Sequence, residues 1–327
     1  MPGPLIVLPR PGALASETPR IISAPSERAF VTAFGQLLPQ ASFLQTKNGR
    51  IAFYALPTSP ITAEQATNPV TRVLFVHGIQ TCAIGLQPLA STLSARFPSA
   101  KCVLVDLWGH GLTDTPFVPH DAALAHDLLE SVMVHIGWED AHFVGFSLGG
   151  SLTASFAAAR PERVASLTLV APAGFVRQGQ FDEVQRSYLR GGEGLEVQAK
   201  AWILDFLEGG DLVVPPDWKE RVERGEVVAE AVRQWQMEHH EGHVASVVAL
   251  FRDAGVLDND EEFAKATKTG IKNLCILGQL DGIVNEHDLH SIGMQNTVLV
   301  PQAGHAVVRE KVPEVAGLIE DFWKKLE

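Results

Sequence analysis

Short runs of aliphatic and β-branched residues recur along the chain, separated by stretches in which apolar residues return every three or four positions. The runs hardly alternate with polar residues, which is typical of strands buried on both faces of a sheet. They lie at residues 73–76, 102–105, 142–144, 167–170, 274–277 and 297–300, with helical stretches at 88–96, 121–136, 150–160 and 312–325. This order predicts an α/β fold, a mostly parallel central sheet covered by helices on both faces.

One interval breaks this rhythm. About a hundred residues separate the run at 167–170 from the run at 274–277, far more than a crossover of ~10–15 residues needs. Helical patterns fill the interval around 182–189, 195–207, 227–237 and 244–251. We therefore expect an N-terminal extension (1–40), a core in two pieces (41–172 and 269–327) and an inserted helical cap (173–268). The core is expected to begin with a β-hairpin around Asn48-Gly49.

The net charge and the composition of the chain argue against several kinds of partner and location. The chain has 327 residues, with 26 Lys+Arg against 38 Asp+Glu and a formal net charge of −12. This balance argues against a nucleic-acid or anionic-membrane partner, and no apolar run reaches the ~20 residues that span a bilayer. Three cysteines are too few for a disulfide scaffold, so we expect a reducing compartment and a cytoplasmic protein. We expect a monomer or a homodimer. The segment 173–268 carries 19 acidic and 11 basic residues, which favours a neutral, apolar substrate.

The strongest local motif is Gly145-Phe146-Ser147-Leu148-Gly149-Gly150. It follows a predicted strand and opens a helix of small residues, which is the setting of a nucleophile turn. Such a turn lifts the Ser147 hydroxyl clear of the sheet. We expect Ser147 to be a catalytic nucleophile.

A serine needs a base, and the base needs an orienting group. His305 directly follows the last predicted strand, where catalytic groups of open parallel sheets collect. Asp281 follows the preceding strand in the same way and is the expected acid, with Glu286 and Asp288 as alternatives.

Backbone amides are the expected oxyanion donors. His77-Gly78-Ile79-Gln80 follows the first buried strand, and the N–H groups of Ile79 and Leu148 are the predicted pair. His77 is expected to orient this loop rather than to transfer protons.

Taken together, these motifs resemble the α/β-hydrolase-fold serine hydrolases with a helical cap, from about residue 41 to the C-terminus. The resemblance rests on His77-Gly78, Asp106-Leu107-Trp108-Gly109-His110-Gly111, 145–150, 278–284 and Gly304-His305. It implies the triad Ser147, Asp281 and His305, the oxyanion pair, a pocket between cap and core, and a structural turn at 106–114. A serine at 147 argues against the epoxide hydrolases and haloalkane dehalogenases, which have a carboxylate there.

Several other residues are candidates for binding. Substrate contacts are predicted for Gln80, Trp202, His239, His240 and His243. His239 and His243 share a helical spacing, but no further ligand completes a metal site, so no metal is expected. No phosphate-binding loop or dinucleotide motif is present, so no cofactor is expected.

The residues therefore predict hydrolysis of a small carboxylic ester or lactone through an acyl-enzyme. Three alternatives remain open: a carbon–carbon bond hydrolase of the meta-cleavage type, a cofactor-free haloperoxidase-like activity, and a non-catalytic binding protein of the same fold. The carbon–carbon hydrolase would call for cationic groups facing the pocket.

Overall fold

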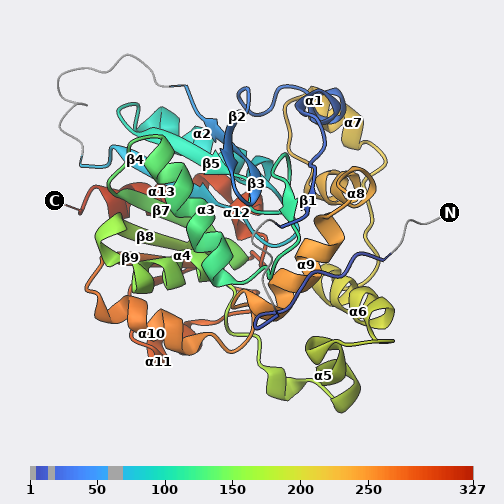
Figure 1. Ribbon diagram of the computed structural model, residues 1–327. Coiled ribbons are helices and arrows are strands. Elements are labelled where there is room, and N and C mark those ends of the chain that lie inside the picture. Colours follow the sequence, from blue (N-terminus) through green and yellow to red (C-terminus); the bar gives the residue numbers. More distant parts are fainter. Residues whose placement is uncertain (1–4, 14–18, 58–68, 327) are drawn as a thin grey trace.

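The computed structural model describes residues 5–13, 19–57 and 69–326. Its centre is a twisted sheet (Figure 1) of eight strands in the order β10-β9-β8-β7-β4-β5-β3-β2, in which β3 alone runs in the direction opposite to the other strands. The sheet strands are β2 (Ser42–Thr46), β3 (Gly49–Ala55), β4 (Arg72–Val76), β5 (Lys101–Val105), β7 (Ala141–Phe146), β8 (Val164–Val170), β9 (Asn273–Gly278) and β10 (Thr297–Val300). A separate pair joins β1 (Ile21–Ile22) to β6 (Thr115–Pro116).

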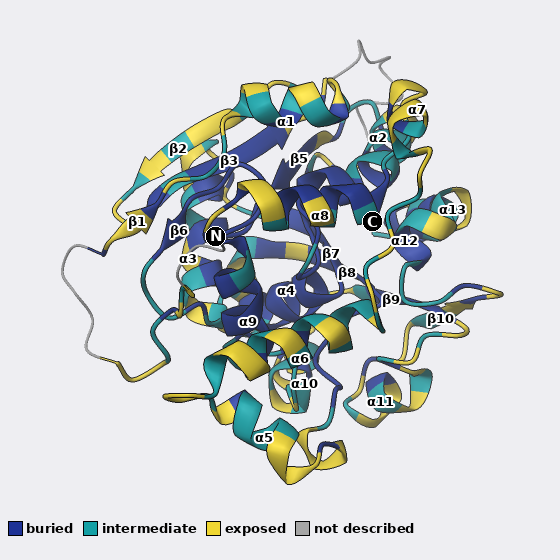
Figure 2. Ribbon diagram, turned by 90° about the vertical axis from the view of Figure 1, so that its right-hand side faces the viewer, coloured by how far each residue is buried: buried dark blue, intermediate teal, exposed yellow. Residues whose placement is uncertain are grey.

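Helices cover both faces of this sheet. One layer contains α3 (Ala122–His135), α4 (Leu148–Ala159) and α10 (Asp260–Lys268), and the other contains α2 (Gln87–Arg96), α12 (Val307–Glu310) and α13 (Val312–Trp323). Alternate residues of β4 enter opposite layers: Leu74 packs in one hydrophobic cluster, and Val73 and Phe75 pack in the other. The central strands are accordingly buried, whereas exposed residues lie on the edge strand β2 and on the outer helices (Figure 2). The predicted α/β class with a mostly parallel sheet is confirmed.

The interval between β8 and β9 is helical, as the periodicity predicts. It holds α5 (Glu183–Arg190), α6 (Glu196–Glu208), α7 (Trp218–Glu223), α8 (Ala229–His239) and α9 (His243–Asp253), which we call the cap helices. The remaining helix of the interval, α10, packs on α4 beside the sheet. Helix α11 (Glu286–Ser291) follows β9.

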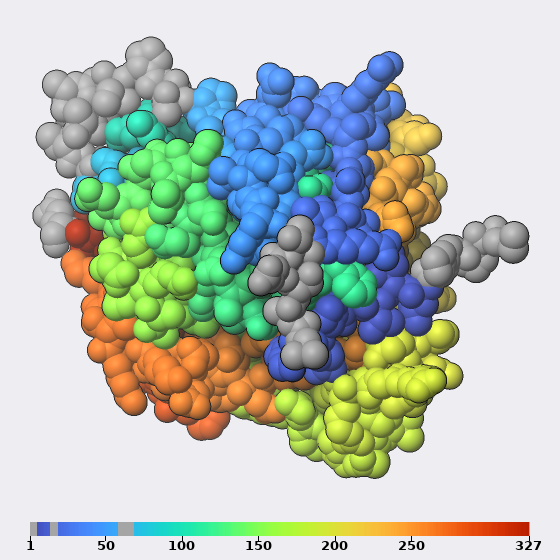
Figure 3. Space-filling view, in the orientation of Figure 1, coloured from blue at the N-terminus to red at the C-terminus, as the bar shows by residue number. Residues whose placement is uncertain are grey.

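The N-terminal segment lies across the cap helices. Residues 5–10, which we call the N-terminal strap, run along α9, where Leu8 is buried against Ala245 and Ala249. The dark-blue strap is visible on the surface in Figure 3. Further along, α1 (Glu27–Phe34) packs Phe30 and Phe34 against Trp235 of α8. The described parts of the extension are therefore packed against the cap helices.

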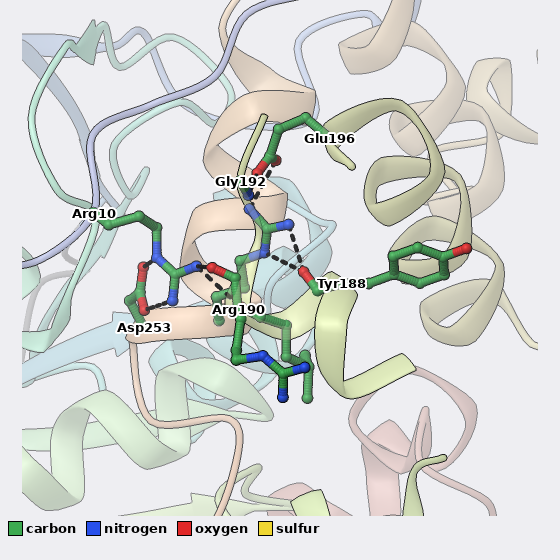
Figure 4. A network of polar contacts seen from close by, with 8 residues as sticks. Arg10, Tyr188, Arg190, Gly192, Glu196 and Asp253 are labelled. Carbon is green, nitrogen blue, oxygen red and sulfur yellow. Dashed lines mark hydrogen bonds and ion pairs between the residues drawn. The ribbon is translucent and has the colours of Figure 1, made fainter. Parts of the chain in front are cut away.

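Arg10 anchors the strap (Figure 4). Its guanidinium pairs with Asp253 at 2.6 Å and donates to the carbonyls of Leu189 and Arg190 at 3.0 and 2.9 Å. Beside it, Arg252 pairs with Glu196 at 2.9 Å. These contacts tie the strap to α9 and to the end of α5.

Within the described residues, no helix has both the length and the apolar character needed to cross a membrane.

Candidate active site

Ser147 occupies the turn between β7 and α4. Its backbone adopts φ 53° and ψ −119°, in the left-handed half of conformational space that non-glycine residues rarely enter. Hydrogen bonds hold this strained position, because the Ser147 N–H donates to Val170 O and the Ser147 carbonyl accepts from the Gly150 and Ala173 N–H groups. The turn presents the hydroxyl at the carboxyl end of the sheet.

Gly149 lets the turn approach the neighbouring strand. A Cβ atom at this position would lie 2.1 Å from the carbonyl oxygen of Val76 at the end of β4. No flexible side chain could move aside, because the clashing atom belongs to the backbone. The position therefore requires glycine, as the motif predicts.

His305 joins the serine to a carboxylate. The Ser147 hydroxyl lies 2.9 Å from His305 Nε2, and His305 Nδ1 lies 3.0 Å from Asp281 Oδ2. The Asp281 side chain is fully buried, and its other oxygen accepts the Ile283 N–H at 2.8 Å. With Asp281 ionised, Nδ1 carries the proton and Nε2 is free to accept the serine proton.

The two alternative acids lie elsewhere. Glu286 is in the first turn of α11, and Asp288 faces Arg177 at 3.5 Å. Neither contacts His305 among the described residues. Geometry thus favours Asp281 as the orienting carboxylate.

Ile79 and Leu148 lie where the sequence places the oxyanion donors. Both line the cavity beside Ser147, and neither N–H donates a hydrogen bond to another described residue. The Ile79 loop is fixed from behind: Ile79 O contacts His110 Nε2, and the Gln236 amide donates to Gln80 O at 2.9 Å. Fixed, unpaired backbone donors suit the stabilisation of a tetrahedral oxyanion.

A cavity of about 220 Å³ opens beside the serine, between the sheet and the cap helices. Residues of the cap helices and of the neighbouring loops form its apolar wall: Val176, Phe206, Leu207, Phe251, Val256 and Ile283. Gln80 also lines it and donates to Glu208. Of the predicted substrate contacts, Gln80 is therefore the one that faces this cavity.

Four predicted contacts do not line it. His239 is exposed and stacks on Trp235, with ring centroids 5.0 Å apart, whereas His240 and His243 are buried with ring nitrogens 2.9 Å from the carbonyls of Thr113 and Gly109. Trp202 packs its ring edge-on against Phe181 and Phe251 inside the cap. We therefore correct these four predictions. His240 and His243 tie α8 and α9 to the 106–114 turn, His239 covers Trp235, and Trp202 is a packing residue.

The turn after β5 is built around Asp106. The buried carboxylate accepts hydrogen bonds from the Tyr54 hydroxyl, the Ala83 N–H and the Leu112 N–H at 2.8–2.9 Å. Burial raises the pKa of Asp106 to about 6, although these hydrogen bonds oppose the rise. His77 likewise points away from Ser147, with Nε2 accepting the Leu107 N–H. Both residues hold loops in place.

Sequence reasoning missed the two arginines that line the cavity, Arg233 of α8 and Arg309 of α12. The available signal was the position of Arg309, four residues after His305 and directly after the apolar run Ala306-Val307-Val308.

Comparison with known proteins agrees with this architecture. Residues 71–226 match the family model described as the alpha/beta hydrolase fold. The chain has the α/β-hydrolase fold. The solved structure of an enol-lactonase from Burkholderia xenovorans superposes on this α/β-hydrolase-fold chain with a TM-score of 0.62 at 15% identity, covering 87% of this chain and 100% of that one. At this identity the likeness concerns the fold alone.

Two curated relatives match over shorter stretches. A dihydrolipoyllysine-residue acetyltransferase component of an acetoin cleaving system from Cupriavidus necator is 33% identical over 123 residues, 36% of this α/β-hydrolase-fold chain and 30% of the relative. The 2-(acetamidomethylene)succinate hydrolase of Mesorhizobium japonicum is 32% identical over 107 residues, 33% of this chain and 37% of the relative. The matches thus span about a third of each relative's length.

Proposed function

We propose that this protein hydrolyses a small carboxylic ester or lactone through an acyl-enzyme on Ser147. The observation that carries the proposal is His305, which contacts Ser147 Oγ and Asp281 at 2.9 and 3.0 Å at the edge of a cavity with two unpaired backbone donors. The relative from Mesorhizobium japonicum is itself named a hydrolase, which agrees with the proposal.

The proposed reaction has two stages, in which Ser147 is acylated and then released by water. His305 Nε2 takes the Ser147 proton as Oγ attacks the substrate carbonyl, and the Ile79 and Leu148 N–H groups stabilise the oxyanion. The tetrahedral species collapses, and His305 gives its proton to the leaving alcohol. A water molecule, deprotonated by His305, then releases the acid and restores the Ser147 hydroxyl.

The test is Ser147→Ala assayed with short p-nitrophenyl esters and labelled with a fluorophosphonate probe. We expect kcat to fall by a factor of at least ~10⁴ and labelling to disappear, because no other described group can take the nucleophile's place. Ser42→Ala, which changes an exposed serine on β2, is the matched control and should retain both signals. Undiminished turnover or labelling in Ser147→Ala would refute the proposal.

A carbon–carbon bond hydrolase with the same three residues is the second candidate. The two arginines in the cavity wall favour it, since the acidic ketone substrates of such enzymes need cationic partners. Product analysis separates the two: an ester yields an alcohol and an acid, whereas cleavage of a carbon–carbon bond leaves a product with a new C–H bond.

A further inference from the structure

Arg309 is a cation at the cavity wall, and Glu230 and Glu310 act on its charge without forming an ion pair with it. Across the described residues it has no ion pair, and its side chain makes no hydrogen bond. Nη1 is buried without any partner, and the guanidinium carbon lies 5.2 Å from the centre of the Phe146 ring. Burying a charge is costly unless it is paired, so an unpaired arginine beside a cavity indicates an anionic ligand.

Arg233 adds a second positive charge to the same wall. It lies 3.4 Å from both Glu208 and Glu230, so its own charge is largely balanced within the protein. Burial and the nearby Arg233 lower the pKa of Arg309 to about 10, although Glu230 and Glu310 oppose the change, and Arg309 stays protonated at neutral pH. Arg309 is therefore the guanidinium left for a ligand.

The cavity lining lacks an acidic residue that could neutralise Arg309. Its described lining contains Arg233, Arg309 and His305 as the ionisable groups, and no Asp or Glu. Glu208 and Glu230 do not line the cavity, but both pair with Arg233 of its wall. A negatively charged ligand would meet positive charge here.

The arginine is also close to the reacting serine. Phe146, the residue before Ser147, has its ring centre 5.5 Å from the His305 ring and 5.2 Å from the Arg309 guanidinium carbon. The Arg309 guanidinium and the His305 ring thus both lie next to the Phe146 ring, and the apolar wall can cover the carbons of an acyl chain between them. This spacing suits a short acyl chain with a carboxylate at its far end.

We propose that Arg309, assisted by Arg233, binds a carboxylate on the acyl part of the substrate, an inference that rests on the hydrolysis proposed above. The substrate class is then a half-ester of a short dicarboxylic acid or a lactone bearing a carboxylate. This departs from the neutral, apolar substrate that the charge of the chain suggests. A planar guanidinium can hold a carboxylate through two parallel hydrogen bonds.

Kinetics with two matched esters test the proposal. One is p-nitrophenyl hemiadipate, and the other carries an isopropyl group in place of the free carboxylate. We expect the wild type to prefer the hemiadipate in kcat/KM, and Arg309→Met to lower this preference ratio ~10–100-fold, mainly through KM. Arg309→Lys should recover part of the ratio because it keeps the charge and loses the planar fork.

Lys311→Met is the matched control. It removes a positive charge two residues away that does not line the cavity, so the preference ratio should stay at the wild-type value. Arg309→Met should melt at or above the wild-type temperature because it removes an unpaired charge. Equal preference ratios in the wild type and Arg309→Met would overturn the proposal.

Binding separates this proposal from the hydrolytic one. Adipate binding to Ser147→Ala, measured by calorimetry, should weaken at least ~10-fold when Arg309→Met is added. If no ester is hydrolysed and adipate still binds through Arg309, the hydrolytic function fails and the carboxylate site stands. If esters are hydrolysed and Arg309→Met leaves adipate affinity unchanged, the carboxylate site fails and the hydrolytic function stands.

Discussion

The hydrogen bond to Asp281 decides which nitrogen of His305 carries the proton. A carboxylate can only accept, so Nδ1 must donate, and the lone pair of Nε2 then faces Ser147 Oγ at 2.9 Å. Asp281 is buried and tied to the Ile283 N–H, so it cannot swing away without leaving that donor unpaired. The buried Asp281 carboxylate thus determines which nitrogen of the partly exposed His305 ring can accept the serine proton.

Asp281→Asn should therefore lower kcat by ~10⁴-fold while leaving the fold intact. The amide can donate to Nδ1, which moves the ring proton to Nε2 and removes the base from the serine. Asp288→Asn is the control, because Asp288 faces Arg177 and not His305, and we expect wild-type kcat from it. Steady-state kinetics of both variants decide the matter: a wild-type kcat for Asp281→Asn would show that the orienting acid lies elsewhere.

The candidate catalytic residues could be proposed from the sequence because they follow strands. The directions of side chains on helices could not be predicted in this way. Ser147, Asp281 and His305 each follow a strand, and strand ends meet at one edge of a parallel sheet. The direction of a helical side chain depends on how the helix packs, and sequence spacing does not reveal that. Hence His239 faces outward, His243 faces the core, and Arg309 was overlooked although it faces the cavity.

At the scale of elements, the N-terminal strap completes a helix that is remote in sequence. Leu189 and Arg190 are the last residues of α5, where backbone carbonyls lack partners within the helix, and Arg10 donates to both. The same guanidinium pairs with Asp253, the last residue of α9. Two cap helices thus share one external cation at their carboxyl ends, where positive charge is favourable.

Arg10→Ala should loosen the cap more than the core. Removing the guanidinium leaves Asp253 partly buried without its ion pair and two carbonyls without a donor, a loss of about 1–3 kcal/mol. Hydrogen exchange should accelerate in α5 and α9 and stay slow in the sheet. Arg28→Ala changes an exposed arginine of the same extension and should leave exchange unchanged. Unaltered protection of α5 in Arg10→Ala would contradict this role.

Two short helices, α7 and α10, were not predicted from the apolar periodicity of the sequence. Helix α7 has six residues, too few for a repeating apolar face, and α10 buries only Phe263 and Ala266 among nine residues. The position of α10 is set by its packing on α4, a contact between residues about a hundred positions apart. Longer helices with a full apolar stripe, such as α9, were predictable to within two residues of their observed ends.

At the scale of the whole molecule, buried histidines connect the main parts of the structure. His77 of the loop after β4 lies 5.1 Å from His110 of the 106–114 turn, measured between ring centres, and His110 lies 4.7 Å from His243 of α9. Burial and the neighbouring rings lower the pKa of His77 and His243. Each ring is therefore neutral in the folded protein at neutral pH, and its protonation would place an unfavourable charge at the joint between core and cap.

The free energy of unfolding should consequently decrease as the pH falls from about 6.5 to 4. Burial lowers the pKa of His120, His126 and His240 to about 4, so over this range the unfolded chain binds more protons than the folded one. Asp106, Glu208 and Asp253 act in the opposite direction, because their pKa values are raised, that of Asp106 to about 6. The histidines outnumber these three carboxyls, because the pKa values of His77, His110, His142 and His243 are lowered as well. We expect a slope of at least about 2 kcal/mol per pH unit near pH 5.

Denaturant titrations at several pH values measure this slope. His126→Gln provides the check, because a Gln amide can still donate toward the Ser155 hydroxyl and does not titrate. Its slope should be smaller by about one proton, roughly 1 kcal/mol per pH unit. Equal stability at pH 7 and pH 5 in the wild type would contradict the neutral state of these rings.

The strap also constrains the order in which the molecule can be completed. Arg10 precedes Leu189 by 179 residues and Asp253 by 243, so its partners do not yet exist when it leaves the ribosome. Strands β2 to β8 can pair during synthesis, since domains begin to fold from their N-terminal side. Residues 5–10 therefore stay without their partners until α9 has been synthesised. The contacts of Arg10 with α5 and α9 therefore form late in folding, after the strands of the sheet have paired.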